Sequence, residues 1–201
     1  MKILELFSGT ESISKLARAR GHEVFTIDNN PEHNPDWCID IRQVKRKDII
    51  EKFGHPDVIW ASPPCQHFSI ATHKHWKNKR PKQKAKESIK LVSYTLKLII
   101  DLFPTFWFME NPRGRLRFVL GKPYTTVFYG AYNHPCLKPT DLWGHHPKIN
   151  WNTKIIGKLI KFQNWHCGKK RQILRSVIPE NLCLDIIKAC ESELAERLIA
   201  R

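Results

Sequence analysis

The stretch Val58-Ile59-Trp60-Ala61-Ser62-Pro63-Pro64-Cys65 joins a short apolar run to two prolines and a cysteine. A run of β-branched and aromatic residues that stops at prolines predicts a buried strand ending in a rigid loop, because proline fixes φ and donates no ladder hydrogen bond. Cys65 then lies just past the carboxyl end of a strand. Ligands bind at that edge in open α/β sheets, so the thiol is a candidate nucleophile. A lone cysteine is more often a small buried hydrophobe, and residue type alone leaves that alternative open.

The amino-terminal residues predict a strand, a turn and a helix. Residues 2–7 form an apolar run, Gly9 lies in the turn, and residues 12–20 have helical periodicity. A second apolar run at 24–27 ends in the acid Asp28. In this order Gly9 lets the backbone approach a ligand closely beside a helix N-terminus, and Asp28 can hold a ribose diol across the crevice.

A second carboxylate follows a later strand. The apolar run Phe106-Trp107-Phe108-Met109 predicts a fifth buried strand, which ends in Glu110-Asn111-Pro112. If this strand and the one before Cys65 are neighbours in a parallel sheet, Cys65 and Glu110 lie over the same crevice. The alternative for Glu110 is an acid that caps a helix.

The remaining pattern alternates strands with helices and predicts an α/β fold with a mostly parallel sheet. Residues 88–103 have apolar positions at helical spacing, including Ile100 and Phe103. The other elements are predicted as strands at 37–41, from 125 and at 141–144, helices at 44–53 and 179–199, and hairpin strands within 151–165.

The charge of the chain predicts a polyanionic partner. Among 201 residues, 34 Lys and Arg face 19 Asp and Glu, which gives a formal net charge of +15. Eight of the basic residues and one acid lie between His73 and Lys90, next to Cys65. A basic segment of this kind favours nucleic acid, although a merely soluble basic surface is the alternative. Within it, residues 74–86 fit a mobile loop that closes on a polyanion, or equally a solvated linker.

Cysteine usage and the amino terminus predict a reduced, intracellular and cytoplasmic protein. The six cysteines form no Cys-x-x-Cys pair, and the chain opens without a signal-peptide pattern. No apolar run approaches the roughly 20 residues needed to cross a bilayer. The histidines and cysteines of the carboxyl-terminal half match no familiar zinc-finger spacing, so we expect no metal.

The motif around Cys65 resembles the catalytic signature of the DNA (cytosine-5) methyltransferases. The resemblance rests on Pro63-Pro64-Cys65-Gln66 with Phe68-Ser69. It implies that the thiolate adds to C6 of a flipped cytosine, after which C5 takes a methyl group from S-adenosylmethionine. A thiolate suits a soft, weakly electrophilic carbon and can leave again. Glu110 resembles the acid of the family's Glu-Asn-Val motif, which hydrogen-bonds the target base, with Pro112 in place of valine.

The resemblance extends to the cofactor loop. Leu6-Phe7-Ser8-Gly9 is similar to the family's Phe-x-Gly-x-Gly, although Glu11 or Ser12 stands where a second glycine is usual. Asp28 matches the ribose-binding acid, and Asp40 matches an acid that contacts the adenine amino group, with capping of the next turn as the alternative for Asp40. The residues implied to line the cofactor are Phe7, Ser8, Gly9, Thr10, Asp28, Asn29, Asp40, Ile41 and Pro63.

The likeness covers roughly the first 130 residues and then thins. The family's Gln-x-Arg-x-Arg is absent, and Lys138 is the candidate substitute for an arginine that contacts base or phosphate. Residues 131–178 leave room only for a reduced recognition insert within a single methyltransferase domain spanning 1–201. The residues implied to contact substrate are Pro64, Gln66, Ser69, Asn111, Arg113 and Lys138.

The resemblance implies a Rossmann-like, doubly wound methyltransferase fold with strand order 3-2-1-4-5-7-6. The implied function is cytosine C5 methylation of DNA, of the kind found in restriction-modification or phage. Two alternatives stay open: a related enzyme that acts on RNA or makes another C5 modification, and a basic nucleic-acid-binding module that has lost catalysis. Target sequence and oligomeric state do not follow from the sequence.

Overall fold

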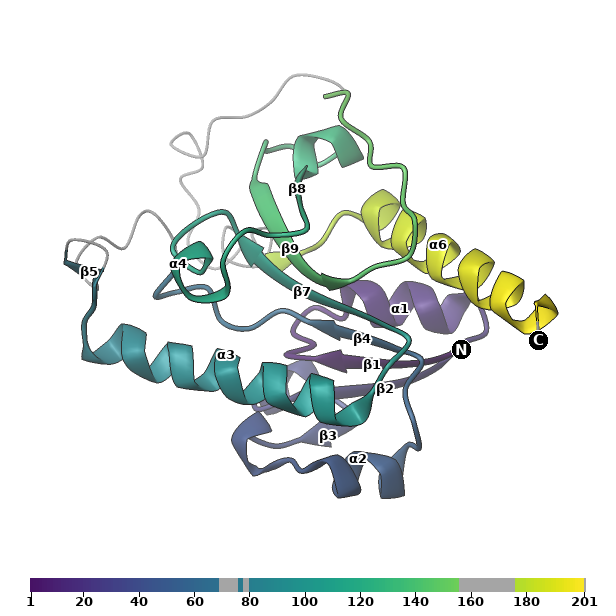
Figure 1. Ribbon diagram of the computed structural model, residues 1–201, viewed down its shortest axis with the longest axis horizontal. Coiled ribbons are helices and arrows are strands. Elements are labelled where there is room, and N and C mark those ends of the chain that lie inside the picture. Colours follow the sequence, from purple (N-terminus) through teal and green to yellow (C-terminus); the bar gives the residue numbers. More distant parts are fainter. Residues whose placement is uncertain (69–75, 78–79, 156–175, 201) are drawn as a thin grey trace.

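The computed structural model describes residues 1–68, 76–77, 80–155 and 176–200. Its centre is a seven-stranded sheet in the order β3-β2-β1-β4-β7-β9-β8 (Figure 1). Counted along the chain within this sheet, that order is the expected 3-2-1-4-5-7-6. The strands are β1 (Lys2–Leu6), β2 (Glu23–Asp28), β3 (Trp37–Cys38), β4 (Val58–Ala61), β7 (Phe106–Pro112), β8 (Thr125–Phe128) and β9 (Pro139–His145).

The first five strands of the sheet are parallel, and β9 runs antiparallel to both β7 and β8. The apolar runs 2–6, 58–61 and 106–109 occupy the centre, where both faces of a parallel sheet are covered. The α/β fold class with a mostly parallel sheet is therefore confirmed.

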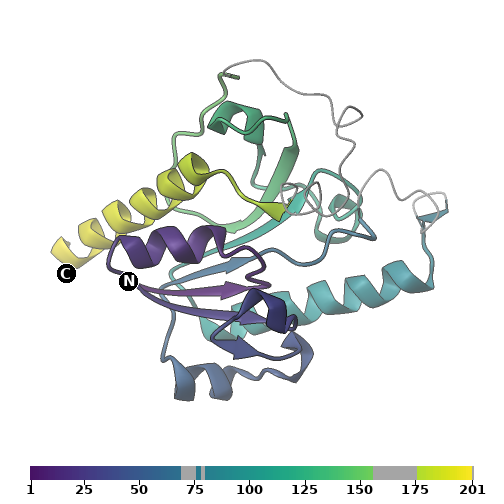
Figure 2. The same ribbon diagram turned by 180° about the vertical axis from the view of Figure 1, so that it is seen from behind.

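Helices cover both faces of the sheet. Successive residues of a strand pack alternately against the helices on one face and on the other. Val58 and Trp60 of β4 pack with α1 (Ser12–Ala19) and α6 (Glu180–Ile199) on one face. Ile59 and Ala61 pack on the other face, with α2 (Arg46–Lys52) and α3 (Gln83–Leu102). Figures 1 and 2 show α1 beside α6 on the side of the sheet opposite α3. This alternation is what a period-two strand buried on both faces requires.

The helix expected at 88–103 begins five residues earlier, at Gln83. Its first turn consists of good helix formers rather than apolar residues, and it is supported by bonds to Glu87 from Gln83 (2.9 Å) and Lys90 (3.1 Å). The expectation that Ile100 and Phe103 pack inward was wrong, since they are 53% and 82% exposed. Phe103 lies past the helix end in the left-handed region, with φ of 51°.

The segment expected to be a solvated loop at 74–86 contains more structure than its composition indicated. Trp76–Lys77 (β5) pairs with Arg80–Pro81 (β6) in a short antiparallel hairpin, and α3 follows at once. Residues 69–75 and 78–79 lie outside the described residues.

Two further elements are shorter than expected. The strand predicted at 37–41 contains only Trp37–Cys38, because Asp40 caps the 3-10 helix η2 (Ile41–Gln43). Of the hairpin predicted within 151–165, residues 151–155 form no strand and the rest lies outside the described residues. No helix in the described part of the chain is both long and apolar enough to span a membrane.

Candidate active site

The candidate site lies where the order of the sheet reverses direction. β1 pairs with β2 on one side and with β4 on the other, and all three are parallel. The turns that follow β1 and β4 therefore leave the sheet at one edge, on either side of the switch point. These are the turn that carries Gly9 and the loop that carries Cys65.

The turn after β1 takes an unusual backbone path. Phe7, Gly9 and Glu11 all have positive φ, at 59°, 47° and 55°. This region suits glycine and is uncommon for residues with a Cβ. Glu11 stands at the position of the second glycine in Phe-x-Gly-x-Gly. The residue differs from the family's glycine, but its backbone has the positive φ that glycine favours.

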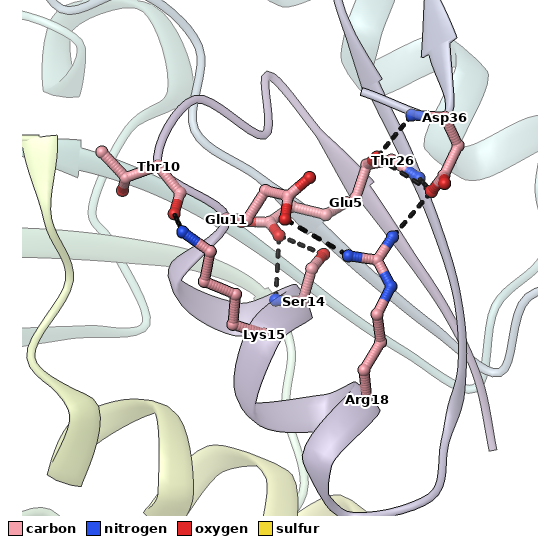
Figure 3. A network of polar contacts seen from close by, with 8 residues as sticks. All are labelled: Glu5, Thr10, Glu11, Ser14, Lys15, Arg18, Thr26 and Asp36. Atoms are coloured by element: carbon pink, nitrogen blue, oxygen red, sulfur yellow. Dashed lines mark hydrogen bonds and ion pairs between the residues drawn. The ribbon is translucent and has the colours of Figure 1, made fainter. Parts of the chain in front are cut away.

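A chain of ion pairs and hydrogen bonds anchors Glu11 in that conformation (Figure 3). Its carboxylate accepts from Arg18 at 3.3 Å, and Arg18 also pairs with Asp36 at 2.8 Å. Asp36 in turn accepts from the backbone amide of Thr26 in β2 at 2.8 Å. The glycine-like residue is thereby tied to the second strand of the sheet.

Asp28, at the end of β2, binds the same turn from across the crevice. Its two carboxylate oxygens accept from the backbone amides of Gly9 (3.0 Å) and Asn30 (2.8 Å). Each oxygen keeps a second lone pair for a ligand hydroxyl. Nearby, the Ser8 hydroxyl is buried and has no hydrogen-bond partner. Buried polar groups are normally paired, so an orphan here fits a site that takes a polar ligand.

Asp40 has the capping role that the sequence left open. It accepts from the backbone amide of Arg42 at 2.9 Å and forms an ion pair with the Arg42 side chain. The hydrogen bonds from that guanidinium lower the pKa of Asp40 below its usual value. Ile41 beside it is buried, whereas Asn29 is exposed. Contact of these residues with a cofactor stays a prediction.

The loop after β4 is held at several points around Cys65, which is partly exposed rather than a buried core thiol. The Phe68 amide donates to the Cys65 carbonyl at 3.0 Å, and the Trp76 indole donates to the His67 carbonyl at 2.6 Å. The Arg115 amide donates to the Phe68 carbonyl at 2.8 Å. Trp76 therefore helps to hold the loop of Cys65. In the sequence it is only an isolated aromatic residue within the basic segment 74–86.

Gly114 lets the chain after β7 approach this loop closely. A Cβ at Gly114 would lie 2.4 Å from the Phe68 carbonyl oxygen. No other residue could occupy the position without displacing the loop. The close approach fixes the loop against the segment that follows Glu110.

Glu110 lies on the neighbouring strand, as the sequence required. β4 and β7 are parallel neighbours, and Ala61 at the end of β4 pairs with Met109. β7 continues to Pro112 because Glu110 and Asn111 pair with β9, so Glu110 is inside a strand and caps no helix. The Asn111 amide donates to the Pro63 carbonyl at 2.9 Å. This bond joins the strand of Glu110 to the loop of Cys65.

Glu110 is buried in a polar cluster that the sequence did not predict. The Tyr129 hydroxyl donates to its Oε1 at 3.1 Å. The Lys138 ammonium lies 4.3 Å from the centroid of the Tyr129 ring, so this candidate arginine substitute packs on the tyrosine that contacts Glu110. In the sequence, Tyr129 follows a predicted strand and Tyr129-Gly130 resembles a Tyr-Gly pair of the family, but neither feature predicted a contact with Glu110.

The other predicted substrate residues have differing exposure. Pro64, Gln66 and Arg113 are exposed. Asn111 is fully buried, and its side-chain amide donates to the Pro63 carbonyl. Its side-chain oxygen Oδ1 has no hydrogen-bond partner. Ser69 lies outside the described residues. No three His, Cys, Asp or Glu side chains converge as metal ligands within the described ranges.

The sequence profile of the C-5 cytosine-specific DNA methylases matches residues 1–123. The chain belongs to this family. A Frog virus 3 (isolate Goorha) protein named probable DNA (cytosine-5)-methyltransferase is 30% identical over 167 residues, covering 78% of this chain and 72% of that protein. The family assignment confirms the resemblance drawn from Cys65 and its neighbours.

One solved structure shares the fold of this chain with a TM-score above 0.5, at lower identity. A protein from an E. coli prophage, crystallised as a candidate DNA modification methyltransferase, is 17% identical and superposes with a TM-score of 0.54 over 80% of this chain. A triple mutant of Spodoptera frugiperda DNMT2 is 18% identical, with a TM-score of 0.45 over 79% of this chain. The chain spans 52% and 54% of these two structures. The viral source of the 30% identical relative agrees with the expected restriction-modification or phage setting.

Proposed function

We propose that this chain methylates C5 of cytosine in DNA, with Cys65 as the nucleophile and Glu110 as the acid that holds the target base. The observation that carries the proposal is the Asn111 to Pro63 hydrogen bond of 2.9 Å, which joins the strand of Glu110 to the loop of Cys65 at one edge of the sheet. Family membership supplies the reaction, and this bond supplies a reason why these two residues act on one base.

In the proposed reaction, the Cys65 thiolate donates an electron pair to C6 of a flipped cytosine and forms a C–S bond. The C5–C6 double bond opens, and C5 becomes the nucleophile. Glu110, buried on β7, accepts a hydrogen bond from the exocyclic amine and gives a proton to the ring nitrogen N3, which neutralises the negative charge that develops on the base. After methylation, a base removes the C5 proton and the C–S bond breaks, which restores the double bond. The base must leave the stack, because C6 cannot be reached inside a duplex.

The crevice beside β1 fits S-adenosylmethionine. When bound, this cofactor supplies the methyl group in electrophilic form. Gly9 would lie against it, since the nearest atom to its Cβ position is the Phe7 carbonyl oxygen at 3.8 Å. Asp28 would accept from ribose hydroxyls, and the orphan Ser8 hydroxyl would gain a partner. Phe7, Thr10, Asn29, Asp40, Ile41 and Pro63 complete the proposed lining.

The proposed DNA-binding surface runs from the loop of Cys65 along the start of α3. Its exposed basic residues are Arg80, Lys82, Lys84 and Lys86. They would contact phosphates, which carry little sequence information. Affinity should then fall steeply with salt. A strong preference for one short site, retained at high ionic strength, would instead show that residues 131–178 contain a sequence reader.

The recognition insert expected within residues 131–178 can be narrowed from the fold. Pro139–His145 of the 131–178 segment is β9 of the central sheet, and 156–175 lie outside the described residues. We propose that residues 1–201 act as one methyltransferase domain whose recognition insert is confined to the remainder of this segment. A chain with 156–175 replaced by a short Gly-Ser linker should keep cofactor affinity and lose only affinity for DNA.

The test of function is methyl transfer from labelled S-adenosylmethionine to duplex DNA, single-stranded DNA and RNA in parallel. We expect label on cytosine C5 of DNA, none with Cys65→Ala, and a much lower rate with Glu110→Gln. Label on RNA alone would favour the related RNA enzyme. Binding of DNA without binding of the cofactor would show a nucleic-acid-binding module and overturn the proposal.

A further inference from the structure

We infer that Tyr129 is a positioning residue for Glu110, and that its hydroxyl holds one carboxylate oxygen so that the acid meets the target base in a single orientation. The inference rests on the proposed function of Glu110. It adds to that function a residue from the part of the chain that follows the family match, which ends at residue 123.

The contact joins two elements that are distant in sequence. Tyr129 opens the 3-10 helix η4 (Tyr129–Tyr132), directly after β8, and Glu110 lies on β7. The phenol hydroxyl donates to Glu110 Oε1 at 3.1 Å, the Tyr129 side chain is fully buried, and Glu110 is 7% exposed. A hydrogen bond to a buried carboxylate is charge-assisted and is not exchanged for water.

The Tyr129 ring is fixed from more than one side. The Lys138 ammonium lies over the ring face at 4.3 Å from the centroid, and His134 meets the ring edge-on at 5.7 Å between centroids. A ring held by a cation and an aromatic edge cannot swing its hydroxyl away. The donor is therefore preorganised before any base enters.

The direction of the hydrogen bond follows from the charges. Burial, and then the negative charge of Glu110, raise the pKa of Tyr129 well above its ordinary value. The phenol stays protonated and donates, and Glu110 accepts. A glutamate on a strand has three rotatable side-chain bonds, so fixing one oxygen removes orientations in which the acid would miss the base.

The experiment measures the rate of covalent adduct formation on DNA that carries 5-fluorocytosine, in the presence of S-adenosylmethionine. Tyr129→Phe removes only the hydroxyl and keeps the ring contacts. We expect the rate at saturating DNA to fall about ten- to a hundredfold, the cost of one charge-assisted hydrogen bond, with DNA affinity unchanged within about twofold.

Tyr132→Phe is the matched control. It lies in the same 3-10 helix, is 3% exposed, and its hydroxyl accepts from the Asn152 amide at 2.9 Å rather than contacting Glu110. This variant also loses one tyrosine hydroxyl and its hydrogen bond, at a partly buried position, and should keep the wild-type rate. An equal loss in both variants would show a structural effect of the helix and overturn the inference.

A double-mutant cycle separates positioning from general support. If Tyr129 acts through Glu110, then Tyr129→Phe should change the residual rate of a Glu110→Gln protein by less than about twofold. A full additional loss in that background would contradict the inference while leaving the function of Glu110 intact. If the wild-type protein forms no adduct at all, the proposed function itself fails. Urea-unfolding midpoints of the wild type, the two single variants and the double variant would then still show whether Tyr129 and Glu110 interact.

Discussion

Residues 1–123 and residues 124–200 contribute to the site in different ways. The first part matches the family profile and contains the five parallel strands, whose carboxyl-end loops carry Gly9, Asp28 and Cys65. The second part adds two antiparallel strands and α6, and it departs from the family at the missing arginines. It places the Tyr129 hydroxyl on Glu110 and the Lys138 ammonium over the Tyr129 ring. The difference shows that the residues expected to bind cofactor and base are fixed at one edge of the sheet by the first part. Support for Glu110 also comes from the second part, where the chain departs from the family.

The junction between the two parts should tolerate least change. Gly144 on β9 has φ of 142°, and a Cβ there would lie 1.9 Å from the Trp107 carbonyl oxygen on β7. We expect Gly144→Ala to destabilise the protein by more than about 4 kcal/mol, because two paired strands would have to separate. Urea unfolding measures the free energy of unfolding of the variant and the wild type. A variant that fails to fold would also agree with this prediction.

Gly121→Ala is the matched control for that prediction. Gly121 also has positive φ, at 76°, but nothing lies within 4 Å of its Cβ position. The cost should be only about 1 to 2 kcal/mol, from backbone strain alone. Equal effects of the two substitutions would mean that β7 and β9 are not packed as described.

The first part contains a buried acid that should make stability fall with rising pH. Glu5 is 2% exposed, and burial raises its pKa to about 7 although the Ser14 hydroxyl and amide donate to it (Figure 3). The folded state therefore binds more protons than the unfolded state between about pH 4.5 and 7. Stability should drop by roughly 3 kcal/mol across that range and level off above it. Glu5→Gln should remove this dependence in urea unfolding at pH 5 to 8. The same slope in the variant would exclude Glu5 as its source.

The second part contains a buried histidine with the opposite dependence. Burial among aromatic rings lowers the pKa of His146 to about 4, and Phe108 and Tyr124 lie 4.4 Å from it between ring centroids. The unfolded state then binds more protons below about pH 6.5. Stability should fall by roughly 3 kcal/mol as pH drops from 6.5 to 4. His146→Phe cannot be protonated and should flatten the acid limb of the same titration. An unchanged limb would place the acid sensitivity elsewhere.

The cofactor crevice should respond in binding more than in stability. Asp28→Ala removes the carboxylate that holds the Gly9 amide and is proposed to hold ribose. We expect the S-adenosylmethionine Kd to rise about ten- to a hundredfold, since a charge-assisted hydrogen bond contributes about 1.5 to 3 kcal/mol. Titration calorimetry measures it, with Asp28→Asn as a variant that keeps one acceptor. An unchanged Kd would refute the assignment of Asp28.

The smallest effect should come from Glu11. Its φ of 55° strains a residue with a Cβ, and Glu11→Gly restores the residue usual in the family. We expect a gain in stability of up to about 1 kcal/mol, because relief of strain outweighs both the entropy of glycine and the exposed Arg18 ion pair. Thermal unfolding detects a gain of this size. A loss of stability would mean that the Glu11 to Arg18 to Asp36 chain matters more than the strain.

The strands and the reacting groups were predictable because each depends on local sequence. Apolar runs before Asp28, Pro63 and Glu110 mark three strands, although β7 continues past Glu110 to Pro112, and parallel strands bring their carboxyl ends to one edge. The start of α3 was missed because its first turn is mostly polar: Gln83 pairs with Glu87, and only Ala85 of that turn is buried.

The support for the site was not predictable, because it depends on tertiary contacts. The strand order implied by the resemblance already placed β9 between β7 and β8, but nothing near Tyr129 in sequence shows that its hydroxyl contacts Glu110. The same holds for Trp76, whose indole reaches the carbonyl of His67. The left-handed conformation of Glu11 was hidden as well, since glutamate gives no local signal for it.

The most direct test of the account asks whether Cys65 bonds to cytosine. Fluorine at C5 blocks the proton loss that normally releases the enzyme, so DNA carrying 5-fluorocytosine should trap the covalent intermediate. Mixed with the protein and S-adenosylmethionine, it should give an adduct that survives denaturing electrophoresis, and mass spectrometry should place the bond on Cys65. Cys65→Ala should give no adduct and no methyl transfer. Methylation of DNA by the Cys65→Ala protein at the wild-type rate would contradict the account.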